Sequence, residues 1–128
     1  MSQPMADETE TTYADGTTLV NVLGSPARVR ILAVLTGETD RDLNPTQICE
    51  QAGIGSSAFY DHIEDLRAWN LVEKTRMTGN SPMYRLNTDS DAAQHLGEFE
   101  WSLVEYTVEK EKCGELDENN QPILVEDD

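Results

Sequence analysis

The sequence contains few basic residues and no long apolar run. Lys and Arg together number 9 among 128 residues, against 25 Asp and Glu, and the formal net charge is −16. Proteins that bind nucleic acids usually carry an excess of Lys and Arg, so the overall composition is not typical of that class. No segment approaches the roughly 18 consecutive apolar residues that a membrane-spanning helix needs. We therefore expect no membrane partner.

Cysteine is also scarce, and Cys49 and Cys113 lie far apart in the sequence. Small secreted domains that depend on disulfides contain more cysteines at closer spacing. Residues 1–16 lack the basic start and the apolar run of a signal peptide. A reduced, cytoplasmic protein is the expectation.

The residue types that usually bind metals or catalyse reactions are dispersed. A metal-sensing site needs closely spaced thiolates and imidazoles, whereas Cys49, Cys113, His62 and His95 are far from one another in sequence. A phosphate-binding glycine loop, an H-E-x-x-H motif and a nucleophile elbow are all missing from the sequence. We expect no metal, no cofactor and no enzymatic activity.

The acidic residues are concentrated at the two ends of the chain. Residues 1–16 contain four acids and no base, and residues 89–128 contain thirteen acids and two Lys. Residues 17–88 are nearly neutral, with eight acids and seven bases. An acid-rich, Lys-poor surface is typical of proteins from cells with molar internal salt, and the alternative is an ordinary acidic tail on a mesophilic protein.

Start and stop signals predict a series of short helices between residues 17 and 53. A short apolar pattern over 17–24 precedes Ser25-Pro26, where Ser caps a helix and Pro occupies its first position. That helix is expected to end at Gly37. Asn44 and Gln47 then have the spacing of a capping box, and the short helix that they begin ends at Gly53.

A third amphipathic helix follows the tight turn at 53–55. Either Ser56 or Ser57 can cap it, and it runs to about Asn70. Its apolar residues are spaced four and three apart, which places them on one core-facing side. These are Phe59, Ile63 and Leu66.

A β-hairpin and a long helix complete the expected elements. Strands over 71–77 and 82–86 enclose a turn at 78–81. Thr88 is expected to cap the last helix, which ends at Gly114. The fold class is therefore mainly α with a small β-hairpin, in the order of a winged helix-turn-helix protein.

This order divides the chain into four segments with separate expected roles. We expect a disordered acidic N-terminus over 1–16, a DNA-binding domain over 17–88, a dimerisation helix over 89–113 and a flexible acidic tail over 114–128. A helix fits the major groove of B-DNA, where its N-terminal residues reach base edges. The hairpin beside it can contact the DNA backbone or the minor groove.

The candidate DNA contacts in the third helix are the side chains that turn away from its core face. They are Ser56, Ser57, Ala58, Tyr60 and Asp61. Hydroxyl groups bind phosphates or base edges. A carboxylate repels phosphates but accepts a hydrogen bond from the cytosine amino group.

Basic residues supply the expected backbone contacts. Arg67 lies later in the third helix, and Lys74, Arg76 and Arg85 all fall on the hairpin. Phosphate contacts of this kind position a protein on DNA. A basic hairpin that is merely solvated is the alternative.

The last helix carries two apolar stripes. Leu96, Phe99, Leu103 and Tyr106 have the spacing of a coiled-coil seam and are the candidate dimer interface. A second stripe has spacings of three and four and consists of Trp101, Val104 and Val108. We expect one stripe to pack on its own domain and the other on a partner; the alternative is that both pack within the monomer.

Three sequence segments resemble a known family. They are LVNVLGSPARVRILAVL, LNPTQICEQAGIGSSAFYDHIEDLRAWNLVEKTR and GNSPMYRLNTD, which together cover about residues 17–90. They are similar to winged helix-turn-helix regulators abundant in haloarchaea, distant relatives of the ArsR and MarR groups. The resemblance implies a transcriptional regulator that binds double-stranded DNA as a homodimer. The chain departs from many such relatives at Asp61, where a basic residue is common.

The net charge of −16 also favours a second interpretation. Winged helices can bind proteins instead of nucleic acids. A protein–protein adaptor without DNA binding is therefore the alternative function.

Overall fold

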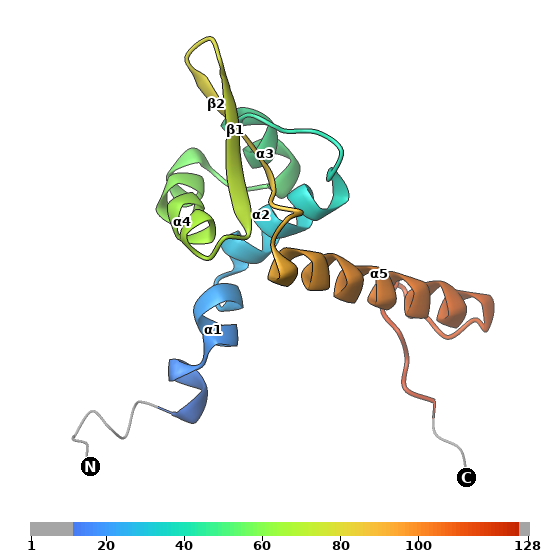
Figure 1. Cartoon of the computed structure of the whole chain (residues 1–128). Helices are drawn as coiled ribbons and strands as arrows, with labels where there is room; N and C mark the ends of the chain where they lie inside the picture. The colour runs from blue at the N-terminus through green and yellow to red at the C-terminus, as the bar shows by residue number, and fades with distance from the viewer. Residues whose placement is uncertain (1–11, 126–128) are drawn as a thin grey trace, which may run out of the picture.

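The computed structural model describes residues 12–125 and contains one hairpin among helices (Figure 1). Helices α2, α3 and α4 gather at the base of the hairpin, while α1 and α5 extend away from it (Figure 1). The predicted winged helix-turn-helix order is confirmed. Its elements are η2 (Tyr13–Gly16), α1 (Thr18–Leu23), α2 (Pro26–Gly37), α3 (Pro45–Ala52), α4 (Ser56–Ala68), β1 (Val72–Thr78), β2 (Ser81–Leu86) and α5 (Asp91–Lys112).

The start of α3 follows the sequence signals. The Asn44 side chain accepts a hydrogen bond from the Gln47 backbone N–H at 2.8 Å, and the Gln47 side chain accepts from the Asn44 N–H at 2.9 Å. The helix ends at Gly53, whose φ of 71° lies in the left-handed region that glycine tolerates best. This capping box and glycine stop orient the turn that leads into α4.

Two helix starts differ from the sequence expectation. Gly55 is the N-cap of α4, so Ser56 and Ser57 are helical residues and neither caps the helix. Ser90, and not Thr88, caps α5, because its side chain accepts from the Ala93 N–H at 3.2 Å.

The hairpin is antiparallel and is joined to the loop before α3. Its register runs from Val72 opposite Leu86 to Thr78 opposite Ser81, with Thr75 as an extra residue between Lys74 and Arg76. Leu43 adds a single bridge to β2, since it exchanges two backbone hydrogen bonds of 2.8 Å with Tyr84. The hairpin therefore has a third, one-residue strand at its base.

The core lies between α2, α3, α4 and the hairpin. Its fully buried large side chains are Phe59, Ile31, Leu35, Leu43, Ile48, Ile63 and Leu66. The predicted core face of α4 is thereby confirmed. The rings of Phe59 and Tyr84 meet edge to face, with centroids 5.6 Å apart. This contact joins α4 to β2.

Helix α5 leaves the domain after its first turns. Ala93 is its one buried residue, and Leu96 packs partly against the core. Phe99 and Trp101 belong to different stripes and each is 61% exposed. The expectation that one whole stripe packs on its own domain is therefore wrong, and so is the alternative that both do. Among residues 12–125, no helix has the length and apolar character needed to cross a membrane.

Short turns are present in the described parts of both chain ends. Of the expected disordered segment 1–16, residues 1–11 lie outside the described residues, and Tyr13–Gly16 forms a 3-10 turn. Of the flexible tail expected over 114–128, residues 114–125 form a reversing turn, and 126–128 lie outside the described part. Asp117 N–H donates to the Gln121 carbonyl, and Ile123 N–H to the Glu115 carbonyl, both at 2.8 Å.

Candidate nucleic-acid interface

Helix α4 presents a polar face to solvent. Because Phe59, Ile63 and Leu66 point into the core, the opposite side of the helix is exposed. The exposed residues include four of the predicted contacts, Ser56, Ser57, Tyr60 and Asp61, while the fifth, Ala58, is half-buried. The Tyr60 ring stands edge to face against Phe59 with centroids 5.0 Å apart, which restricts where its hydroxyl can reach.

The charge on this face is negative. Asp61, Glu64 and Asp65 are exposed, and the predicted backbone contact Arg67 forms an ion pair with Glu64 at 2.7 Å. The Arg67 guanidinium is thus partly neutralised by its own helix. Arg67, which the sequence predicts as a phosphate contact, therefore has Glu64 as an intramolecular partner.

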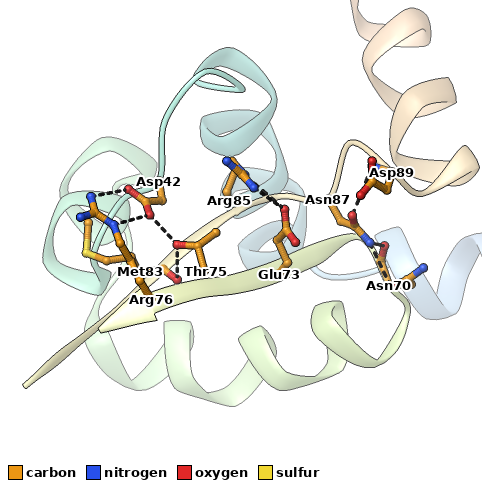
Figure 2. Close-up of polar contacts among 9 residues, drawn as sticks. All are labelled: Asp42, Asn70, Glu73, Thr75, Arg76, Met83, Arg85, Asn87 and Asp89. Atoms are coloured by element: carbon orange, nitrogen blue, oxygen red, sulfur yellow. Dashed lines mark hydrogen bonds and ion pairs between the residues drawn. The ribbon is translucent and has the colours of Figure 1, made fainter. Parts of the chain in front are cut away.

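Arg76 is held by a carboxylate from the loop before α3 (Figure 2). Its Nε donates to Asp42 Oδ2 at 2.9 Å and a terminal nitrogen donates to Oδ1 at 3.1 Å, a bidentate geometry. The Thr75 hydroxyl donates to the same carboxylate. The hydrogen bonds from Arg76 and then Thr75 hold the pKa of Asp42 well below its usual range, and Asp42 in turn raises the pKa of Arg76.

Arg85 is also paired. It lies opposite Glu73 in the β-ladder and donates to one carboxylate oxygen from two nitrogens, at 2.9 and 3.2 Å (Figure 2). Two of the three hairpin bases that the sequence assigned to the DNA backbone therefore already bind carboxylates. Asp42 and Glu73 were missed because the relevant pairing depends on the hairpin register and on the packing of a distant loop.

Lys74 is the hairpin base without such a partner. Within residues 12–125, Lys74 and Arg30 are the basic side chains that form no ion pair with a carboxylate. Lys74 lies opposite Tyr84 in the ladder, and opposite residues share one face of a sheet. Because Tyr84 packs on Phe59, that face is the one turned toward α4. Lys74 is thus an exposed, unpaired cation beside α4.

A shallow groove separates α3 from the start of α4. It has a volume of about 280 Å³ and its lining includes Cys49, Ser56 and Tyr60. Burial raises the pKa of the Cys49 thiol, which keeps it protonated and unreactive at neutral pH. In the described part of the chain, no group of three or more His, Cys, Asp and Glu side chains could hold a metal ion.

A second, apolar surface lies where α1, α2 and α5 meet. An apolar cavity of about 450 Å³ is lined by residues of α1, α2 and α5 and by Trp69 and Leu71. A neighbouring cavity of about 240 Å³ lies between α2 and α5, where Phe99 and Leu103 form part of the wall. The predicted dimer residue Leu96 lines both cavities, and Tyr106, further along α5, is exposed.

Several solved structures resemble this chain at low sequence identity. The AntR antimony-specific transcriptional repressor superposes with a TM-score of 0.56 and 22% identity, over 77% of this chain and 86% of AntR. Reduced HlyU from Vibrio cholerae gives 0.55 and 22%, over 77% of this chain and 97% of HlyU. A homodimeric winged helix-turn-helix DNA-binding domain from Mycobacterium bovis, a possible ArsR-family regulator, gives 0.54 and 17%, over 82% and 92%. These likenesses establish the fold.

No protein-family model matches the chain, and no curated protein matches it.

Replacing Asp42 with Asn is expected to destabilise the protein in a pH-dependent way. Since the folded-state pKa of Asp42 lies below its ordinary value of 3.8, ionised Asp42 stabilises the fold above that pH, and the stabilisation is lost progressively as the pH falls below it. Urea unfolding should therefore show a deficit for Asp42→Asn at neutral pH that shrinks steadily toward about pH 2. Glu38→Gln, which removes an exposed i,i+3 pair with Arg41, is the control and should change little. A deficit of equal size at both ends of the pH range contradicts the pairing.

Proposed function

We propose that this chain is a DNA-binding transcriptional regulator, with α4 in the major groove and the hairpin on the DNA backbone or in the minor groove. The observation that carries the proposal is the arrangement of an exposed polar helix face beside a hairpin, joined through Phe59 and Tyr84. The same fold occurs in structural neighbours that include a transcriptional repressor and a DNA-binding domain. A non-enzymatic, cytoplasmic role follows from this proposal.

The exposed residues suggest a division of roles. Ser56, Ser57 and Tyr60 lie at the N-terminal end of α4, the part of such a helix that reaches base edges. Asp61 is suited to accept a hydrogen bond from a cytosine amino group. We assign the first phosphate contact to Lys74, because it forms no ion pair that would have to break on binding.

Arg67, Arg76 and Arg85 have a different role in this proposal. Each would exchange a carboxylate for a phosphate as the protein docks. Such an exchange replaces one charge-assisted hydrogen bond with another, so its net contribution to affinity is small. The acidic surface therefore limits non-specific binding and leaves base contacts to decide where the protein binds.

Lys74→Ala is expected to weaken binding to all DNA sequences alike and to reduce the slope of log affinity against log salt by about 0.9, the value for one phosphate contact. Arg76→Ala/Arg85→Ala should also weaken binding to all sequences, and by less per residue. Ser57→Ala should change the preference between sequences. Fluorescence anisotropy with two duplexes over a KCl series measures all three effects. Lys112→Ala, at the far end of α5, is the control, and an unchanged slope for Lys74→Ala removes the assigned contact.

The second part of the proposal is a homodimer formed through α5. A contiguous patch of large apolar side chains on a monomer surface marks an interaction site, whereas single exposed ones do not. Phe99, Leu103 and Tyr106 are 61%, 48% and 55% exposed, and together with Leu96 they form one stripe. Two α4 helices held one turn of DNA apart would read a palindrome, which raises the affinity of a monomer with few free cations.

Phe99→Glu/Leu103→Glu is expected to yield a folded monomer with much weaker DNA binding, because carboxylates cannot be buried in an apolar interface. Light scattering should give the wild type about twice the chain mass of 14.3 kDa and the variant a single chain mass. Ser102→Glu, an exposed polar position of the same helix, should remain a dimer. A wild-type mass of one chain contradicts the dimer.

The haloarchaeal origin suggested by sequence resemblance stays a prediction, and we propose that the protein is adapted to molar salt. Its 25 acidic residues repel one another when unscreened. The melting temperature should therefore rise steeply between dilute and molar KCl. A melting temperature that does not change with KCl contradicts the proposal.

The protein–protein adaptor is the second candidate function. The acidic face of α4 favours it, and so do the ion pairs that Asp42 and Glu73 form with the hairpin arginines. It becomes the better account if no duplex binds at any KCl concentration.

A further inference from the structure

Arg28 connects three helices through one guanidinium group. It lies in the first turn of α2 and only 14% of its side chain is exposed. It donates to the Asn21 carbonyl in α1 at 2.5 Å and to His62 Nδ1 in α4 at 3.1 Å, and it forms an ion pair with Asp65, also in α4. All three contacts are directional, and two of them fall on α4.

The contacts on α4 determine how that helix is turned. Phe59, Ile63 and Leu66 bury one side of α4, but apolar contact is non-directional and tolerates small rotations of a helix about its axis. His62 and Asp65 are three residues apart and therefore lie on one face, one turn from each other. A rigid guanidinium fork bound to both restricts rotation and sliding of α4 against α2.

The contact with His62 requires a neutral imidazole. Arg28 can only donate, so His62 Nδ1 must accept, and the ring hydrogen is on Nε2, which lies 3.4 Å from the Ser25 hydroxyl. A protonated imidazole carries hydrogens on both nitrogens and has no acceptor for Arg28. Protonation would also place two cations side by side.

The charged groups around His62 come from two helices. Arg28 is contributed by α2, and Asp65 by α4, where Asp61 is also the chain neighbour of His62. The carboxylate of Asp65 is already bound by Arg28. Helix α1, Thr18–Leu23, contains no charged residue. Because a proton on His62 Nδ1 and the hydrogen bond from Arg28 exclude each other, acid is expected to break this contact.

We propose that Arg28 is the positioning residue for α4, and that it holds this helix at both His62 and Asp65 only while His62 is unprotonated. A protonated ring leaves the Asp65 ion pair as the one Arg28 contact on α4. This inference rests on the proposed function for its biological meaning, because α4 is the helix assigned to base contact. It makes the orientation of the DNA-reading face, and hence the affinity for DNA, sensitive to acid.

Amide hydrogen exchange of the full-length protein tests the proposal without DNA. After correction for intrinsic rates, wild-type protection in α4 should fall about tenfold between about pH 8 and about pH 5.5, the size expected for losing one hydrogen bond that involves a charged group. In His62→Asn, the amide oxygen can accept from Arg28 at both pH values, so protection should stay constant. His95→Asn, at an exposed histidine of α5, should behave as the wild type does.

A second variant separates positioning from charge. Arg28→Lys keeps the cation but lacks the fork that reaches both α1 and α4, so protection in α4 should be low at both pH values, while circular dichroism remains that of a folded protein. The proposal is overturned if wild-type protection in α4 does not depend on pH, or if His62→Asn responds to pH as the wild type does.

If exchange behaves as expected but no duplex binds, the positioning role stands and the proposed function fails. If duplexes bind but exchange is independent of pH, the positioning role fails alone.

Discussion

The edge-to-face contact between Phe59 and Tyr84 is the interaction on which the arrangement of this protein depends. Phe59 is the fourth residue of α4 and is fully buried. Tyr84 lies in β2 and is 3% exposed. The backbone of Leu43 is hydrogen-bonded to the backbone of Tyr84, so the loop before α3 is also attached to β2 at this residue. One aromatic pair therefore sets the position of the hairpin relative to α4, and with it the geometry of the candidate interface.

Charge pairing is the second constraint, and it determines which basic side chains lack a partner within the protein. Arg28, Arg67, Arg76 and Arg85 all bind carboxylates within the domain. A guanidinium that already has a charged partner gains little from a phosphate, whereas Lys74 gains the full contact. In the proposed complex with DNA, this pairing would lower the general attraction to nucleic acid and would leave more of the selectivity to base contacts.

The sequence predicted local features well because local signals determine them. The capping box of Asn44 and Gln47, the glycine stop at Gly53 and the apolar spacing of α4 are all read within one or two helical turns, and each is present in the structure. The expectation that Thr88 caps α5 was wrong, because Ser90, two residues later, is also of a type that caps helices. Only the turn that Asn87 forms, by accepting from the Ser90 N–H at 3.0 Å, distinguishes them.

Features that depend on distant residues could not be predicted in this way. Asp42 meets Arg76 across 34 residues because Leu43 pairs with β2, and no spacing in the sequence indicates that pairing. The sequence identified Arg85 as basic but not as paired, because its pairing with Glu73 depends on the exact hairpin register. The two stripes of α5 were recognised as apolar, yet their exposure follows from the direction in which α5 leaves the domain (Figure 1).

The central claim is that α4 and the hairpin form a single DNA-binding surface. The most direct test is a titration of the ¹⁵N-labelled protein with a duplex of about 20 base pairs, long enough for non-specific binding at low salt. Amide shifts should change first at Ser56, Ser57, Tyr60 and Lys74, while residues 114–125 remain unaffected. Changes confined to α5 and the C-terminal turn, or no changes at a large excess of DNA, would contradict the claim.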